Sequence, residues 1–140
     1  IMEEDYSQLP IELPRICGYE AKWLQDSPYF KLLRSIDAKL DRKTENKIIT
    51  CSLKLAERLD CRDYTRFDWR LDAHGIPKLL EVNPNPGWCY DGHLAKMAAL
   101  TGMPYADMLK SILEAAELRI NSSTNTSNKA VFTEAMSVNE

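Results

Sequence analysis

Close cysteine pairs, long apolar runs and an excess of one charge are all missing from this sequence of 140 residues. Its four cysteines, Cys17, Cys51, Cys61 and Cys89, stand far apart. They have neither the short spacing of a zinc site nor the density of a disulfide scaffold. We therefore expect reduced thiols, with one or two disulfides in a secreted protein as the alternative.

Membrane and nucleic-acid functions also find no support in the composition. No uncharged stretch approaches the roughly 18 apolar residues of a membrane helix, and the first residues contain no secretion signal. The 18 basic and 21 acidic residues are spread along the chain and give a net charge of -3, so no basic patch for nucleic acid appears. We expect a soluble, cytoplasmic protein whose partners are small molecules or proteins. Because the sequence begins at Ile1 rather than Met, we expect a processed or truncated chain.

The first 43 residues show little periodicity. Residues 11–17 alternate weakly and predict an edge strand, since Pro14 cannot donate to a central ladder. Residues 18–43 are charged and aperiodic, with a turn signal at 25–28, and predict a long, mobile surface loop.

Regular structure is predicted for most of the following 77 residues, 44–120. Apolar residues recur at helical spacing over 44–59, and a hairpin of two strands follows. The other predicted elements are a helix over 92–100 capped by Asp91, a helix over 104–119, and a disordered polar tail over 121–140. Together these elements predict an α+β fold, with a small, mostly antiparallel sheet at 64–82 covered by helices.

The predicted hairpin joins strands 64–71 and 76–82 through a turn at 72–75. Since side chains alternate along strands, four polar residues share one face: Arg66, Asp68, Glu81 and Asn83. A turn closed by Asp72 and Gly75 predicts that Arg66 faces Glu81 and that Asp68 faces Leu79. The opposite face then carries the apolar residues Phe67, Trp69, Leu71, Ile76, Leu80 and Val82.

The polar face has the groups that a magnesium ion prefers. Mg²⁺ takes oxygen ligands, typically one or two carboxylates with water and substrate phosphates, and Asp68, Glu81 and Asn83 offer such oxygens. Arg66 would neutralise charge on a transferring phosphoryl group. The alternative is an ordinary half-exposed hairpin with an Arg66–Glu81 salt bridge on its solvent face, which the hairpin pattern by itself favours.

Longer motifs carry a family resemblance. They are Tyr19-Glu-Ala-Lys22-Trp, Cys61-Arg-Asp-Tyr-Thr-Arg66-Phe-Asp68, Leu80-Glu81-Val-Asn83-Pro-Asn-Pro-Gly87 and Gly102-Met-Pro-Tyr105-Ala-Asp-Met-Leu. In this order and spacing, residues from about Leu9 to Leu118 resemble the C-terminal half of the ATP-grasp domain of D-alanine–D-alanine ligases and their relatives. The resemblance implies that residues 1–120 are the C-terminal part of such a domain, with 18–43 as the loop that closes over the active site.

The resemblance also implies an activity and its cofactors. The enzymes of this family use ATP as co-substrate and Mg²⁺ (or Mn²⁺) to activate a carboxylate as an acyl phosphate, which an amine then attacks to form a C–N bond. Asp68, Glu81 and Asn83 correspond to the metal ligands, with Glu81 also counted among the nucleotide-binding residues. Arg66 corresponds to the arginine that stabilises phosphoryl transfer.

Two further positions match residues with a role in the family. Lys22 matches a catalytic lysine that approaches the nucleotide phosphates or the substrate, and it is therefore also a nucleotide-binding residue; an ordinary exposed lysine is the alternative. Gly87 matches the catalytic-site glycine whose backbone N–H lies beside the acyl intermediate.

The sequence departs from dipeptide ligases of this family in two places. Trp23 and Gly92 stand where those enzymes have a tyrosine and a serine that help to bind the second amino acid, and Asp91 and His93 lie in the same region. A surface position at a helix start is the plainer interpretation of His93.

The part of the fold that precedes this region in the family, with its phosphate-binding lysines and glycine-rich loop, has no counterpart in the sequence. We therefore expect the missing upstream ATP-grasp half to be a partner and the isolated chain to be inactive, with a homodimer left open. The alternative function is that of a truncated, inactive ATP-grasp remnant acting as a binding or regulatory module.

Overall fold

The computed structural model describes the backbone of residues 1–137 and the side chains of residues 1–122. Contacts divide the chain into two compact units, Ile1–Glu45 and Asn46–Glu140. Each unit contains one two-stranded antiparallel sheet with helices, so the predicted α+β class is confirmed. The β-structure is split over two small sheets instead of one centred on the hairpin.

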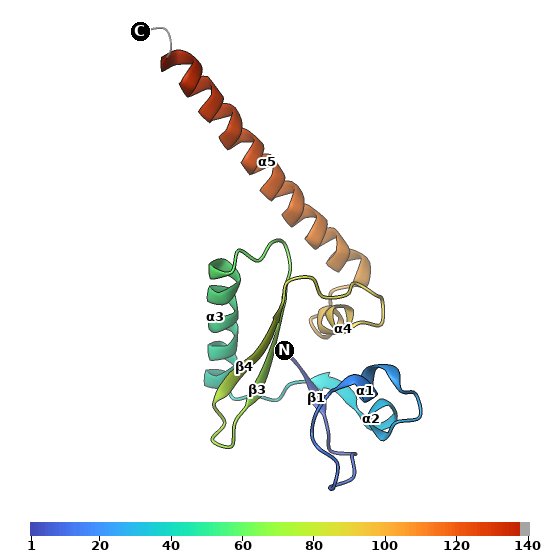
Figure 1. The fold of residues 1–140 in the computed structure, drawn as a ribbon. Coiled ribbons are helices and arrows are strands. Elements are labelled where there is room, and N and C mark those ends of the chain that lie inside the picture. The colour runs from blue at the N-terminus through green and yellow to red at the C-terminus, as the bar shows by residue number, and fades with distance from the viewer. Residues whose placement is uncertain (138–140) are drawn as a thin grey trace. The chain divides into compact units, whose positions relative to one another are not determined.

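The first unit pairs β1 (Met2–Asp5) with β2 (Arg34–Asp37) and inserts two short helices between them (Figure 1). These helices are α1 (Tyr19–Trp23) and α2 (Pro28–Leu32). The Ser27 hydroxyl accepts a hydrogen bond from the Tyr29 N–H at 3.1 Å and so caps α2. The buried Tyr29 ring anchors the unit, since its O–H donates to the Pro14 carbonyl at 3.0 Å.

Two predictions for this unit are wrong. Residues 11–17 form no strand, and Ile11 is 91% exposed; the strand lies instead at 2–5. Residues 18–43 are not one irregular loop, because they contain α1, α2 and β2. Helices of five residues are too short for apolar periodicity to appear. The predicted turn at 25–28 does form, with the Ser27 N–H donating to the Leu24 carbonyl at 2.9 Å, and it leads directly into α2 at Pro28. The mobility of this segment stays a prediction.

The second unit is built around the hairpin of β3 (Arg66–Leu71) and β4 (Pro77–Asn83). Helix α3 (Arg42–Arg58) runs beside this hairpin (Figure 1), and the indole N–H of Trp69 donates to the Ser52 hydroxyl at 3.0 Å. The predicted helix over 44–59 is confirmed. On this helix Ile48 is buried, whereas Leu53 is 67% exposed.

Two helices complete the second unit. Helix α4 (His93–Leu100) is followed by Thr101 and by Gly102, whose φ of +77° suits a glycine. It packs beside the first turns of α5 (Tyr105–Ser137) (Figure 1). The α4 N-cap is Gly92 and makes no side-chain hydrogen bond, so the predicted cap at Asp91 is wrong.

Helix α5 also runs past the predicted start of a disordered tail at residue 121. No proline or glycine occurs between Tyr105 and Ser137 to interrupt its hydrogen bonds. The last part of that predicted tail, 138–140, lies outside the described residues.

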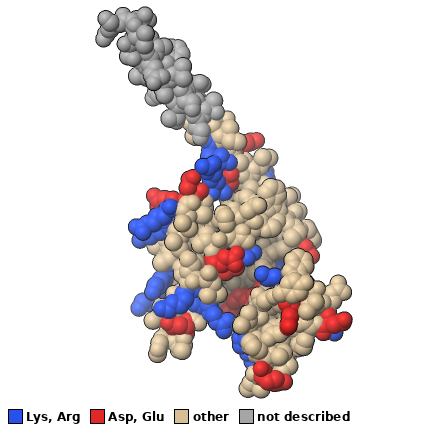
Figure 2. Space-filling model, viewed as in Figure 1, with Lys and Arg blue, Asp and Glu red and all other residues tan. Residues whose placement is uncertain are grey.

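The surface carries mixed charge. Figure 2 shows basic and acidic residues interspersed over the coloured part of the face in view, as the near balance of 18 and 21 charges predicts. Among the residues that the structure describes, no helix is long and apolar enough to cross a bilayer.

Candidate functional site

The β3–β4 hairpin brings two carboxylates face to face. Asp68 lies opposite Glu81 and Arg66 lies opposite Asn83, so the prediction that these four residues share a face is confirmed. The predicted pairing of Arg66 with Glu81 and of Asp68 with Leu79 is wrong. The turn itself forms as expected, because the Gly75 N–H donates to the Asp72 carbonyl at 2.9 Å with Gly75 at φ +71°.

A β-bulge is the reason for the changed register. Between the pairs Asp68/Glu81 and Trp69/Leu79, one residue of β4, Leu80, has no partner. Such an extra residue shifts the alternation of one strand relative to the other. Leu79 therefore joins the apolar face in place of Leu80, which is 65% exposed, and Ile76 lies in the turn at 41% exposure. Beyond the bulge Asp68 and Glu81 are paired directly in the ladder.

Arg66 neutralises the nearer of these carboxylates. Its Nε donates to Oδ1 of Asp68 at 2.7 Å and its Nη2 donates to Oδ2 at 3.0 Å. The pair is partly shielded, with side-chain exposures of 20% for Arg66 and 36% for Asp68. Both oxygens of Asp68 thus accept hydrogen bonds from the Arg66 guanidinium.

Asn83 ends β4 with its side chain fixed by its neighbours. Its Oδ1 accepts the backbone N–H of Asn85 at 3.0 Å, and its backbone carbonyl accepts the Thr65 hydroxyl at 3.0 Å. Because an N–H donor lies against one of the two amide ends, this end is the oxygen. The amide oxygen is therefore oriented before any ligand arrives.

The loop after β4 is held by contacts that the sequence reading missed. Pro86 is fully buried. The indole N–H of Trp88 donates to the Tyr64 oxygen, the Tyr64 hydroxyl donates to the side-chain oxygen of Asn85, and the Tyr105 hydroxyl donates to the Trp88 carbonyl at 2.6 Å. No local pattern reveals these contacts, because the partners are up to 24 residues apart.

Gly87 and Gly92 shape the rest of this loop. The described residues offer the Gly87 N–H no hydrogen-bond partner. At Gly92 a Cβ would lie 2.9 Å from the Cys89 sulfur and 3.1 Å from its carbonyl oxygen. A serine at position 92 would therefore need the Cys89 side chain to turn away and the Cys89 carbonyl to shift by a few tenths of an ångström. His93 begins α4 and is half-buried.

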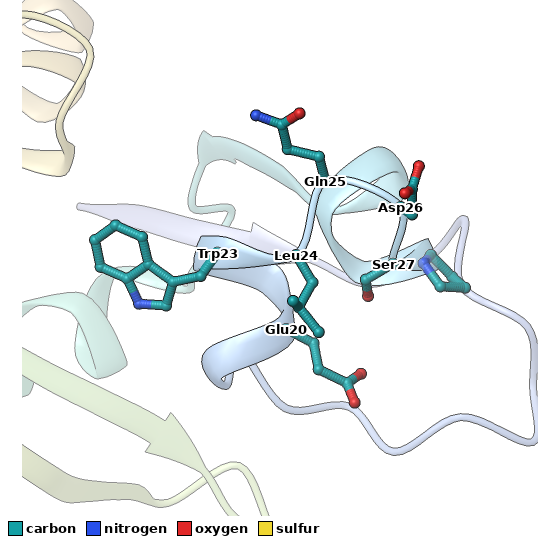
Figure 3. Close-up of a pocket in the computed structure, with 7 residues that line it drawn as sticks. Glu20, Trp23, Leu24, Gln25, Asp26 and Ser27 are labelled. Carbon is teal, nitrogen blue, oxygen red and sulfur yellow. The ribbon is translucent and has the colours of Figure 1, made fainter.

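Lys22 lies in the first unit, exposed on the five-residue helix α1. The nearby hollow of about 550 Å³ is lined by Glu20, Trp23, Leu24, Gln25, Asp26, Ser27 and Pro28. Figure 3 shows that its polar side chains diverge: Trp23 and Glu20 point to opposite sides and Gln25 points away from both. The hollow gathers no convergent polar groups and is a weaker candidate than the hairpin.

The donor set on the hairpin suits a hard cation. No group of three His, Cys, Asp or Glu side chains converges anywhere in the described part of the chain. A metal at the hairpin would therefore rest on the two facing carboxylates and the oriented oxygen of Asn83, all of them oxygen ligands. Those residues fit Mg²⁺ or Mn²⁺ and not zinc, which prefers nitrogen and sulfur.

A second ion pair stabilises the turn before β3. Arg119 of α5 donates to both oxygens of Asp63 at 2.9 and 2.7 Å. This hydrogen-bonded guanidinium lowers the pKa of Asp63 below its ordinary value. Asp63 has φ +63°, a conformation that aspartate tolerates better than most residues. The pair fixes the backbone next to Tyr64.

Known proteins match this chain over its central part. The family described as "D-ala D-ala ligase C-terminus" matches residues 11–114. D-alanine–D-alanine ligases of Cupriavidus taiwanensis and Haemophilus influenzae are 28% and 32% identical over 103 and 97 residues. These alignments cover 74% and 69% of this chain but only 30% and 31% of the two ligases.

A solved structure agrees. The D-alanine–D-alanine ligase of Bacillus anthracis complexed with ATP superposes with a TM-score of 0.58 and 29% identity, over 64% of this chain and 31% of the ligase. Since the family match spans most of the sequence, the chain belongs to the family of D-alanine–D-alanine ligase C-terminal regions, with an ATP-grasp fold.

Proposed function

We propose that this chain is the C-terminal lobe of an ATP-dependent carboxylate–amine ligase and that its β3–β4 hairpin is the magnesium-binding wall of the active site. The family supports the reaction class, since its named relatives are D-alanine–D-alanine ligases. Because the chain spans about 30% of those ligases, the other wall of the nucleotide site is assigned to a second ATP-grasp lobe that acts as its partner.

One observation carries the proposal: Asp68 and Glu81 lie directly opposite each other in the ladder. Like charges in this position destabilise a sheet unless a cation lies between or beside them. The Arg66 guanidinium supplies part of that positive charge. Asn83 adds a third, oriented oxygen on the same face. An ordinary solvent-exposed hairpin has no need of this arrangement.

The residues divide the work of an acyl-phosphate reaction. Asp68, Glu81 and Asn83 would hold magnesium, whose chemistry is to neutralise the phosphates and keep them in line. Arg66 stabilises negative charge on the phosphoryl group as it transfers. The carboxylate oxygen bonds to the γ-phosphorus while the bond to the bridging oxygen of ADP breaks. The amine nitrogen then attacks the carbonyl carbon, loses a proton and expels phosphate.

Lys22 and Gly87 have supporting roles in this proposal. The described residues provide the Lys22 ammonium with no ion-pair partner, so it is available to a phosphate or carboxylate. The unpartnered N–H of Gly87 is suited to donate to an oxygen of the acyl intermediate. Both are binding groups whose charge or dipole matches an anion.

The second substrate is expected to differ from D-alanine. Trp23 is 69% exposed and stands where the family has a tyrosine, and Gly92 stands where it has a serine, at a position where a side chain would crowd Cys89. These changes remove two hydroxyl groups that the family resemblance associates with the second amino acid. We assign the chain to ligation of a small carboxylate to an amine and leave D-alanyl-D-alanine synthesis aside.

Metal binding tests the assignment. Mn²⁺ titration of the 140-residue chain, followed by the electron paramagnetic resonance of the free ion, should give one saturable site. The double variant Asp68→Asn, Glu81→Gln should lose it, because the two carboxylates provide the charge that attracts the cation.

A matched control changes two carboxylates away from the hairpin, Asp26→Asn with Glu114→Gln, and should leave Mn²⁺ binding unchanged. Calorimetry with Mn²⁺ and ATP repeats the comparison with nucleotide present. Equal Mn²⁺ binding by the wild-type chain and the hairpin variant would remove the site assignment and leave the remnant module as the better description.

A further inference from the structure

We propose that Tyr64 is a positioning residue that acts through Asn85 to hold the side chain of Asn83 in the orientation needed for metal binding. The inference rests on the proposed function of the hairpin. Tyr64 is not one of the proposed metal ligands, but hydrogen bonds through Asn85 link it to Asn83.

The Asn83 amide needs such support. An asparagine side chain has two ends of nearly equal size, one a donor and one an acceptor, and a flip would turn an NH₂ group toward the cation. In the structure the Asn85 backbone N–H donates to Oδ1 of Asn83 at 3.0 Å. This bond occupies one lone pair of the oxygen and leaves the second for a ligand. Asn85 thus selects the orientation in which Asn83 is a ligand.

Asn85 can do this only if its own backbone is fixed. Pro84 and Pro86 restrict the flanking torsions, and Pro86 is fully buried. The Asn85 residue itself is exposed, so its side chain has water as an alternative partner. The Tyr64 hydroxyl donates to the Asn85 side-chain oxygen and supplies a fixed partner from outside the loop. Tyr64 and Thr65 lead into β3, so this bond connects the loop to the segment before the opposite strand.

The Tyr64 ring is fixed in turn. The indole N–H of Trp88, which is solely a donor, donates to the Tyr64 oxygen, so the phenol proton is directed at Asn85. The two rings meet edge to face with centroids 5.7 Å apart at 77°. Tyr105 donates to the Trp88 carbonyl at 2.6 Å and ties the group to α5.

Partners of this kind usually matter for metal affinity. Groups that orient a metal ligand typically change affinity about 10- to 100-fold when they are removed. Tyr64→Phe deletes the hydroxyl and keeps the ring contact with Trp88. We expect it to weaken Mn²⁺ binding to the 140-residue chain about tenfold, with a melting temperature close to that of the wild type.

Tyr90→Phe is the matched control. Tyr90 is in the same loop, is 78% exposed and stacks edge to face on Tyr105 at 5.2 Å. The described residues give its hydroxyl no hydrogen bond, so the same chemical change should leave Mn²⁺ affinity unaltered. Equal weakening in both variants would overturn the proposal.

Amide hydrogen exchange separates this inference from the proposed function. In ¹⁵N spectra the Asn85 N–H should be protected in the wild type, exchange faster in Tyr64→Phe and remain protected in Tyr90→Phe. Unchanged Asn85 protection in Tyr64→Phe would refute the positioning role whatever the metal data show. Faster exchange in Tyr64→Phe with no Mn²⁺ binding by the wild type would instead refute the metal site while upholding the link from Tyr64 to Asn85.

Discussion

Arg66 is predicted to affect metal binding in opposite directions with and without nucleotide. Its guanidinium binds both oxygens of Asp68 at 2.7 and 3.0 Å, so we expect it to compete with a free cation for this carboxylate. With ATP present, the same guanidinium has a phosphate to bind and becomes an attractive group. Arg66→Met removes the charge and keeps much of the apolar stem.

The structure sets the size of the first effect. A partly exposed ion pair of this kind, 20% and 36% exposed, contributes about 1 kcal/mol. Losing that competitor should raise the affinity for Mn²⁺ alone by about fivefold, since 1.4 kcal/mol corresponds to a factor of ten. Removing the positive charge of Arg66 also reduces repulsion of the cation, which raises the Mn²⁺ affinity further.

The second effect has the opposite sign. A charge-assisted hydrogen bond to a phosphate contributes about 1.5 to 3 kcal/mol, so Mn·ATP should bind the Arg66→Met chain about 10- to 100-fold more weakly. Electron paramagnetic resonance measures the free ion, and calorimetry measures Mn·ATP.

Lys78→Met is the control for net charge, because Lys78 lies on the same hairpin and pairs with Asp72 at 3.6 Å. It should change neither affinity by more than about twofold, as expected for an exposed pair. If Arg66→Met weakened Mn²⁺ and Mn·ATP by the same factor, Arg66 would support the metal site in both states and the competition would be refuted.

Two further predictions concern stability. The Arg119 guanidinium lowers the pKa of Asp63. The pair therefore stabilises the fold above the ordinary aspartate pKa of 3.8, and this contribution is lost as the pH falls through the lower pKa of the folded state. In thermal melts, the melting temperature of the wild type should therefore fall more on acidification than that of Asp63→Asn. Ser27→Ala removes the cap of α2 and should lower the free energy of unfolding by about 1 kcal/mol in urea titrations, whereas Ser27→Asn should retain most of it and equal losses in both would rule out a capping role.

The elements with strong local signals were predictable. The periodic apolar residues of α3, the strands of the hairpin and its Asp-Gly turn are encoded in short stretches of sequence, and the structure contains them. The short helices α1 and α2 were missed, because five residues give barely more than one turn. Capping by Ser27 was the available signal.

The candidate site was predictable in composition but not in pairing. Alternation alone placed Arg66, Asp68, Glu81 and Asn83 on one face, and the structure agrees. Which residue faces which depends on the bulge at Leu80. A bulge adds one residue without any change in residue type that would reveal it, so the register could not be predicted from the turn.

The sequence by itself thus determined the fold class, the family motifs and the polar face of the hairpin, because these depend on residue type and on spacing along one chain segment. Tertiary structure alone decided that Asp68 meets Glu81, that Arg66 covers Asp68, and that Tyr64 reaches Asn85. Asp68 and Glu81 are 13 positions apart and Tyr64 and Asn85 are 21 positions apart, and at such separations local periodicity carries no information about contact. The short-range Arg66–Asp68 bond depends on which side-chain rotamers the packed hairpin permits.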